Sequence, residues 1–157
     1  MSVADSVGEV CLTQHFEILA VLFSGLFAGS NVYISLIEHP SRMECGAETA
    51  VAVFGPTFRR ASKLNSAMAV LGFLGGFEAW WFGRGTPWLV GAILLMAVIP
   101  FTLVAVMPVN ARLLDDDLDR RSPEAKQLLT RWGRLQWARL VLGVAAFGTF
   151  LAAWTKS

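Results

Sequence analysis

The sequence predicts an all-α integral membrane protein folded as an antiparallel four-helix bundle. Of the 157 residues, 55% are hydrophobic, and the mean hydropathy of +0.54 is high for a soluble protein. Residues 18–37 contain no ionised side chain, and a helix of that length reaches ~30 Å, the thickness of a bilayer core. Three more apolar stretches follow. We therefore expect a single membrane domain over residues 1–157, with transmembrane helices at about 17–38, 60–82, 88–107 and 135–154.

The first of these spans contains most of the polar side chains that occur in the apolar segments. On a helix, Asn31, Ser35 and Glu38 fall within a sector of roughly 60°. An amide in hydrocarbon needs hydrogen-bonding partners, so we expect Asn31 to face the bundle interior. Glu38 and His39 follow one turn after Ser35, and Pro40 is expected to end the helix. Either these groups line a site, or Asn31 and Ser35 only join helices while the other two are solvated.

The segment before the second span is interrupted by Gly55 and Pro56. We expect residues 1–16 to form a polar lead without a long helix, and residues 41–60 to contain a short interfacial helix between the first two spans. The second long helix should then begin near Pro56, because proline is tolerated in the first turn of a helix.

Two pairs of glycines predict where helix backbones approach each other. Gly25 and Gly29 lie on a different face of the first helix from Asn31, and Gly72 and Gly76 have the same spacing in the second. Small residues four apart allow close packing of membrane helices. We expect the two pairs to meet, while a glycine face that stays free could join a second copy in a homo-oligomer.

The last two spans contain clear local signals. Pro100 should kink the third span, whereas Ser122, Pro123 and Glu124 are typical of a helix start, with a cap, a first-turn proline and a first-turn acid. We expect the fourth helix to run from Pro123 to Trp154, with a basic first half that extends into the cytoplasm. Its apolar part is short, so Arg139 is expected to snorkel to the interface.

The distribution of charge predicts the orientation in the membrane. The 38–66 loop and the 108–139 region contain eleven of the thirteen Lys and Arg residues. The positive-inside rule then places both loops in the cytoplasm and both termini outside a cell (inner) membrane. The formal net charge is only +1, which argues against a nucleic-acid partner. The expected partners are membrane lipids and a small hydrophobic molecule.

The cytoplasmic end of such a bundle gathers the candidate site residues. His39 and Glu38 are the candidates for catalysis, because an imidazole exchanges protons near neutral pH. We expect a cavity that is apolar inside and polar at its mouth. No cofactor is predicted, and haem or a metal at His39 is an open alternative without a recognised ligand spacing. The candidate substrate-binding residues are Asn31, Ser35, Asn65, Asn110, Arg112 and Trp132.

Three short motifs lie at this end of the bundle: Asn31 with Glu38-His39-Pro40, Met107-Pro-Val-Asn110-Ala-Arg-Leu113, and Leu129-Thr-Arg-Trp132-Gly-Arg-Leu135. With these motifs the chain resembles the anthrone oxygenase-like family of small four-helix integral membrane proteins. The resemblance covers nearly the whole chain. Some fungal members are implicated in oxidising anthrones to anthraquinones in polyketide biosynthesis without an organic cofactor.

The resemblance implies a base-assisted oxidation of a hydrophobic, anthrone-like aromatic substrate by O₂. In that chemistry His39 would be the base and Glu38 would orient it. Hydrogen-bond donors would hold the substrate oxygens, and Trp132 would wall the pocket. The expected donors are Asn31, Asn110 and Arg112. The residues alone leave a second function open, namely a non-catalytic membrane accessory protein or a binder of lipid, quinone or another hydrophobic ligand.

Overall fold

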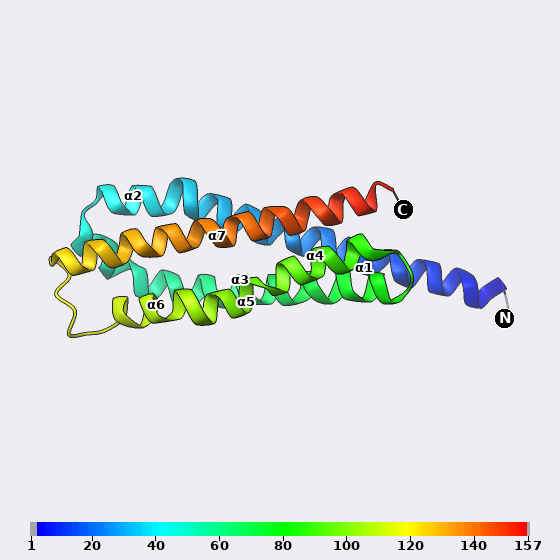
Figure 1. Ribbon diagram of the computed structural model, residues 1–157, viewed down its shortest axis with the longest axis horizontal. Helices are drawn as coiled ribbons and strands as arrows, with labels where there is room; N and C mark the ends of the chain where they lie inside the picture. Colours follow the sequence, from blue (N-terminus) through cyan, green and yellow to red (C-terminus); the bar gives the residue numbers. More distant parts are fainter. Residues whose placement is uncertain (1–2, 157) are drawn as a thin grey trace.

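The structure is a computed structural model that describes residues 3–156, with side chains described from residue 12 onward. These residues are helical and form no strand, and their helices pack as an antiparallel four-helix bundle (Figure 1), which confirms the predicted fold class. Both ends of the chain lie toward the same end of the bundle. In chain order the elements are α1 (Val3–Tyr33), η1 (Ile34–Glu38), α2 (His39–Glu44), α3 (Ala47–Trp81), α4 (Thr86–Met96), α5 (Val98–Phe101), η2 (Thr102–Val106), α6 (Met107–Leu113) and α7 (Pro123–Trp154), where η denotes a π-helical segment.

The first helix is longer than predicted at both ends. It begins at Val3, so the expected polar lead is already helical, and Pro40 does not end it. Proline occupies the first turn of α2, directly after the π-helical turn η1, where its missing N–H and its ring are tolerated. The helical run ends at Gly46, whose φ of 86° is a left-handed conformation that favours glycine.

The predicted break at Pro56 is also wrong, because α3 runs through it. The short helix between the first two long helices is α2 (His39–Glu44), which overlaps only the start of the expected 41–60 segment. An internal proline costs about 3 kcal/mol, and burial of the flanking turn offsets this cost. Ala50, Val51 and Phe54 are buried in an apolar cluster with Leu129 of α7.

Helices α1 and α3 approach backbone to backbone through Gly72 and Gly75. A Cβ atom added at Gly75 would lie 2.7 Å from the backbone N of Ala20 and 2.7 Å from the backbone O of Phe16. A Cβ atom added at Gly72 would lie 3.3 Å from the backbone N of Ser24. Only residues without a side chain permit this contact.

The predicted meeting of the two glycine pairs is therefore not what the structure shows. Gly25 faces the Phe147 ring of α7, which would lie 3.1 Å from a Cβ atom added at this glycine, and Gly29 has nothing within 4 Å of such an atom. Gly76 packs against the Phe150 ring rather than against α1. Helix α1 is rotated so that its backbone at Phe16, Ala20 and Ser24, and not its own glycines, lies against Gly72 and Gly75.

The third helix is interrupted as Pro100 predicts. The α-helix α4 ends at Met96, α5 begins at Val98, and the π-helical segment η2 follows at Thr102. The proline cannot donate a hydrogen bond to the carbonyl one turn earlier, so the regular ladder stops there. Thr102 Oγ1 donates to the backbone O of Val98 at 2.7 Å and satisfies one carbonyl near the break.

The fourth helix has the predicted bounds. Ser122 has an extended backbone (φ −68°, ψ 154°), and its Oγ accepts a hydrogen bond from the backbone N–H of Ala125 at 3.1 Å. Pro123 and Glu124 then occupy the first turn. This is the cap geometry that satisfies a free amide at a helix N-terminus.

Within the described residues, three helical segments are long and apolar enough to cross a membrane: Leu12–Glu44, Thr86–Leu113 and Pro123–Trp154. The fourth long helix, α3, is not among them, and its second half contains Asn65, Glu78 and the glycines of the α1 contact. The predicted crossing at 60–82 therefore stays a prediction.

An ion pair closes the end of the bundle where α3 turns into α4. Glu17 of α1 is buried, its Oε1 lies 2.5 Å from Arg84 Nε, and its Oε2 accepts a hydrogen bond from Arg84 Nη2 at 3.1 Å. Gly83 and Gly85 on either side of the arginine have φ values of 85° and 102°. These left-handed residues shape the turn that brings Arg84 back onto α1.

The interior has two apolar clusters with a polar layer between them. One cluster surrounds Phe27, Trp88 and Phe150 near the chain termini, and the other surrounds Phe54 and Trp132 at the opposite end. Along each of α1, α3 and α7, one buried amide falls between the positions that enter the two clusters. These amides are Asn31, Asn65 and Gln136.

Candidate functional site

The polar layer is a chain of hydrogen bonds across three helices. Asn31 Nδ2 donates to the backbone O of Phe27 at 2.7 Å and to Asn65 Oδ1 at 3.3 Å. Asn31 Oδ1 accepts from Gln136 Nε2 at 2.7 Å, and Gln136 Oε1 accepts from Arg139 Nη1 at 3.2 Å. Asn31 is fully buried, as the sequence predicted. The amides thereby obtain the partners that burial requires.

Asn65 connects this chain to the neighbouring turn of α1. Its Oδ1 also accepts a hydrogen bond from Ser30 Oγ at 2.6 Å, while its Nδ2 donates to the backbone O of Ala61 at 3.0 Å. The structure therefore brings together Asn31 and Asn65, two of the residues predicted for substrate binding. Their mutual bonds hold each side chain in one orientation.

A cavity of about 390 Å³ lies on one side of this layer, between α1, α3, α7 and the interrupted third helix. This volume falls within the range of roughly 300–1,000 Å³ that is typical of small-molecule sites. Its walls are mainly apolar, with a few polar side chains, as such sites usually are. The lining residues are Phe27, Phe58, Ser62, Lys63, Asn65, Ser66, Ala69, Val98, Ile99, Thr102, Leu103, Met107 and Arg139. We refer to it as the larger cavity.

A second cavity of about 30 Å³, the smaller cavity, adjoins the first. The two share Phe58, Ser62, Asn65 and Arg139 as lining residues. The smaller cavity is richer in polar groups, and it includes the predicted site residues Glu38 and Trp132. The full lining is Ile34, Glu38, Arg42, Phe54, Thr57, Phe58, Ala61, Ser62, Asn65, Trp132, Gln136 and Arg139.

Glu38 is paired with a residue on its own helical run. Its carboxylate forms an ion pair with Arg42, one turn later, and the guanidinium of Arg42 is buried 6.0 Å above the centre of the Phe54 ring. The prediction assigned Glu38 to orienting His39. The hydrogen bond that the structure gives to Glu38 goes to Arg42 instead.

His39 packs against α7. Its ring centre lies 5.2 Å from that of Trp132, and a Cβ atom added at Gly133 would collide with the imidazole Nε2. Among the described residues, the buried Nδ1 atom has no hydrogen-bond partner. His39 is also absent from the described lining of both cavities. The imidazole is thus held beside the site residue Trp132, with one buried nitrogen that no described group bonds.

Ser35 and Asn110 are buried, as expected for groups that face the interior. Within the part of the chain that the structure describes, Ser35 Oγ and Asn110 Oδ1 have no hydrogen-bond partner. Asn110 Nδ2 contacts the sulfur of Met107 at 4.0 Å. Neither residue is among the described lining of the two cavities.

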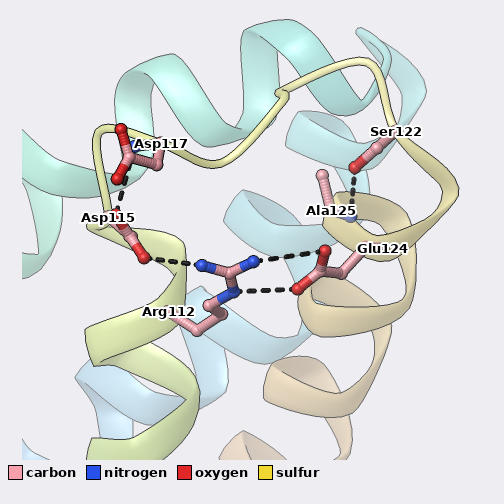
Figure 2. A network of polar contacts seen from close by, with 6 residues as sticks. All are labelled: Arg112, Asp115, Asp117, Ser122, Glu124 and Ala125. Atoms are coloured by element: carbon pink, nitrogen blue, oxygen red, sulfur yellow. Dashed lines mark hydrogen bonds and ion pairs between the residues drawn. The ribbon is translucent and has the colours of Figure 1, made fainter.

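Arg112 lies outside the bundle interior, at the end of α6 where the loop to α7 begins. Figure 2 shows its guanidinium between two carboxylates: Nε donates to Glu124 at 2.8 Å and Nη1 donates to Asp115 at 2.6 Å. The backbone N–H of Asp117 and the Arg112 guanidinium hold the pKa of Asp115 below its ordinary value. Arg112 therefore joins the end of α6 to the start of α7, and it is not brought to the cavities.

Arg139 and Gln136 are site residues that the sequence-based prediction missed. The sequence placed Arg139 at the membrane interface, whereas it lines both cavities and bonds to Gln136. The available signal was the helical spacing of Trp132, Gln136 and Arg139, which places them on the face of α7 that carries the buried residues. As for metals, no three His, Cys, Asp or Glu side chains gather as a possible ligand group in the residues searched, which are the described ones.

Comparison with known families gives one match. The family model described as anthrone oxygenase matches residues 54–149, which is more than half of the chain. The matched segment contains Asn65, Asn110 and Trp132, while Asn31 and His39 precede it. Neither the comparison with curated proteins nor that with solved structures finds a match. By the extent of the family match, the chain belongs to the anthrone oxygenase family.

Proposed function

We propose that this protein is a multi-pass membrane enzyme that oxidises a hydrophobic, anthrone-like aromatic compound with O₂, by base-assisted chemistry that needs no organic cofactor. The observation that carries the proposal, beside the family match, is the larger cavity. It combines apolar walls with a half-buried guanidinium, Arg139, held by the amide layer. A flat aromatic ring system needs the walls, and its oxygen needs the cation.

The placement in the membrane supports a lipid-soluble substrate. Three helical segments can cross a bilayer, and α3 lies alongside them over most of the bundle (Figure 1). We infer that α3 crosses with them, which puts both termini outside and the basic loops in the cytoplasm. The larger cavity includes Leu103 and Met107, which are 60% and 45% exposed on the surface that lipid would cover. The substrate then enters sideways from the bilayer.

The reaction is anthrone + O₂ → anthraquinone + H₂O. A base removes one proton from the methylene carbon, and the electron pair is delocalised onto the carbonyl oxygen. The carbanion transfers its electrons to O₂, and a carbon–oxygen bond forms. The resulting peroxide anion takes up a proton. The O–O bond of this hydroperoxide then breaks, and the outer oxygen leaves as water that includes the second methylene hydrogen, so that the new carbonyl group remains. O₂ is the oxidant, so the step requires no further electron acceptor.

Arg139 takes the role that the sequence assigned to Arg112. A guanidinium is charged at every relevant pH, and a fixed charge beside a developing oxyanion lowers the barrier. Asn31 contributes indirectly, because it holds Gln136, which accepts the Arg139 hydrogen bond. Asn65 lines the cavity itself. Arg112 is held by Glu124 and Asp115 and contributes to stability instead.

For the base, the proposal retains His39 and Glu38. His39 has the unpartnered Nδ1 atom and packs on Trp132. Glu38 lines the smaller cavity and is one-quarter exposed, so it can pass a proton to solvent. Trp132 contacts the imidazole and also lines that cavity, so the proposal retains its predicted role as part of the pocket wall. Ser35 and Asn110 receive no contact with the substrate in this proposal.

A second function uses the same cavity without chemistry. Its apolar walls and the exposed Leu103 would also suit a quinone or a lipid chain that is only bound. Arg139 distinguishes the oxidation from simple binding. Its charge would stabilise the substrate oxyanion and so speed the oxidation, whereas it would contribute little to the affinity for a neutral quinone or lipid.

The test is the rate of O₂ uptake by membranes that contain the protein, after addition of an anthrone such as emodin anthrone. Wild type is compared with Arg139→Met, and Arg134→Met on the exposed face of α7 is the matched control. Because loss of one oxyanion-stabilising donor typically costs roughly 10²–10³-fold in rate, Arg139→Met should fall to the autoxidation background. Arg134→Met should keep the wild-type rate. Equal rates for wild type, Arg139→Met and empty membranes would refute the proposed function and favour simple ligand binding.

A further inference from the structure

The smaller cavity contains more hydrogen-bond donors than its neighbours can satisfy. Trp132 is more than nine-tenths buried, and among the described residues its Nε1–H has no acceptor. The same holds for Nε of Arg139, whose Nη1 alone is bonded, to Gln136. A buried N–H group without an acceptor is unfavourable. Because both residues line this cavity, an occupant that accepts hydrogen bonds would suit it.

The charged side chains around this cavity have a net positive charge, which favours an anion. Its charged lining residues are Glu38, Arg42 and Arg139. The first two neutralise each other in an ion pair. Arg139 forms no ion pair with any carboxylate that the structure describes, and its described polar contact is the neutral Gln136. Arg139 is half-buried, with its Nε atom fully covered. A partly desolvated cation without a counter-ion is left uncompensated, so a negative ligand would be stabilised here.

The size of the cavity limits that ligand to a few atoms. A volume of about 30 Å³ exceeds the roughly 10–15 Å³ that one water requires, and it leaves no room for an aromatic ring or a phosphate. The cavity adjoins the larger one at Ser62, Asn65 and Arg139. A diatomic molecule in it would lie beside whatever occupies the larger cavity.

We propose that the smaller cavity binds a small monovalent anion through Trp132 Nε1 and Arg139, and that in the oxidation this anion is superoxide. The second part rests on the proposed function. The deprotonated substrate in the larger cavity gives one electron to O₂ in the smaller one, which leaves a neutral substrate radical and superoxide. The two then combine through a carbon–oxygen bond into the peroxide anion. Arg139 lines both cavities, so one cation stabilises the negative charge before and after the transfer.

Binding can be measured without turnover, with bromide as the probe. Bromide is a small monovalent anion that quenches indole fluorescence on contact. The purified protein in non-ionic detergent is titrated with sodium bromide against sodium fluoride at equal ionic strength. Subtracting the signal of Trp132→Phe isolates Trp132. Trp137→Phe, which removes a half-exposed indole from the same helix, is the control for the substitution.

We expect saturable quenching of Trp132 in the wild type and in Arg134→Met, and loss of saturation in Arg139→Met. Quenching that rises linearly, or that saturates equally in Arg139→Met, would overturn the anion site. If the wild type saturates with bromide but consumes no O₂ with an anthrone, the anion site stands and the proposed oxygenase function fails.

The assignment of the anion to superoxide has a kinetic test. Trp132→Phe keeps the ring contacts with His39 and Phe54 and removes only the N–H donor. Loss of a hydrogen bond to a charged ligand should lower kcat/KM for O₂ about tenfold or more, with an unchanged KM for the anthrone and an unaltered thermal midpoint. A rise of the anthrone KM with unchanged kcat/KM for O₂ would overturn the assignment.

Discussion

Substitution of Gly75 by alanine tests the contact that sets the rotation of α1 against α3. The added Cβ atom would lie 2.7 Å from the backbone N of Ala20 and 2.7 Å from the backbone O of Phe16, and 3.1 Å from Cβ of Leu19. Ordinary contacts begin at 3.4 Å, so α1 must retreat by about 0.7 Å. A gap of that size forfeits roughly a quarter to a half of each dispersion contact across the interface.

Overpacking costs about 1–3 kcal/mol, and the ~1 kcal/mol by which alanine favours a helix over glycine offsets part of this cost. The remaining cost of up to about 2 kcal/mol should lower the thermal midpoint of Gly75→Ala by up to roughly 8 °C for a domain of this size, measured by circular dichroism in detergent. The matched control is Gly29→Ala on α1, where nothing lies within 4 Å of the added atom. That variant should melt at or slightly above the wild-type temperature. If Gly75→Ala melts with the wild type, the close α1–α3 contact does not exist.

Two further predictions concern the site, and two concern the loop that precedes α7. Gln136→Leu removes the link between Asn31 and Arg139 and leaves one polar group on each of them unpaired, so it should lower the free energy of unfolding by about 1–3 kcal/mol for each group and also lower O₂ uptake. The control, Gln127→Leu at an exposed position of the same helix, should change neither the stability nor the uptake. Full stability of Gln136→Leu would mean that the amide network is not formed. Gly133→Ala should displace the His39 ring that packs on it and should reduce O₂ uptake as His39→Ala does if His39 is the base. Glu38→Gln tests the other candidate base. If all three variants take up O₂ at the wild-type rate, neither His39 nor Glu38 takes part in the mechanism. Arg112→Gln should speed proteolytic cleavage of the 114–122 loop, because it removes the ion pairs with Glu124 and Asp115, and it should leave O₂ uptake unchanged, contrary to the role first predicted for Arg112. Since the pKa of Asp115 is lowered, the loop contact should persist at every pH at which an ordinary aspartate is ionised, and open only as the pH falls through that lowered pKa.

The elements that the sequence predicted well depend on signals only a few residues long. Ser122, Pro123 and Glu124 define the start of α7 because a cap bond, a first-turn proline and a first-turn acid act within one turn. Pro100 interrupts the third helix for an equally local reason. Pro40 and Pro56 misled the prediction, because a π-helical turn and a buried flanking face let the chain continue through them.

The sequence predicted the burial of a site residue where the chemistry of that side chain alone requires burial against other helices. A lone amide in an apolar helix has to face other helices, so the burial of Asn31 followed from its helix alone. Its partners did not follow, because Asn65 is 34 residues away and Gln136 is 105 residues away. Which amides meet depends on the axial offset of three helices, and spacing within one helix contains no information about that offset.

By itself, the sequence determined the all-helical fold, the bounds of the fourth helix, the break at Pro100 and the inward direction of Asn31, since these depend on the helical period, on caps, on proline and on the cost of exposing polar groups to hydrocarbon. The tertiary structure decided the rest. It paired Glu38 with Arg42, held Arg112 at the loop, and brought Arg139 between two cavities. Side chains on different helices meet only after the helices have adopted their rotation and height, and close packing around Gly75 and its neighbours sets both.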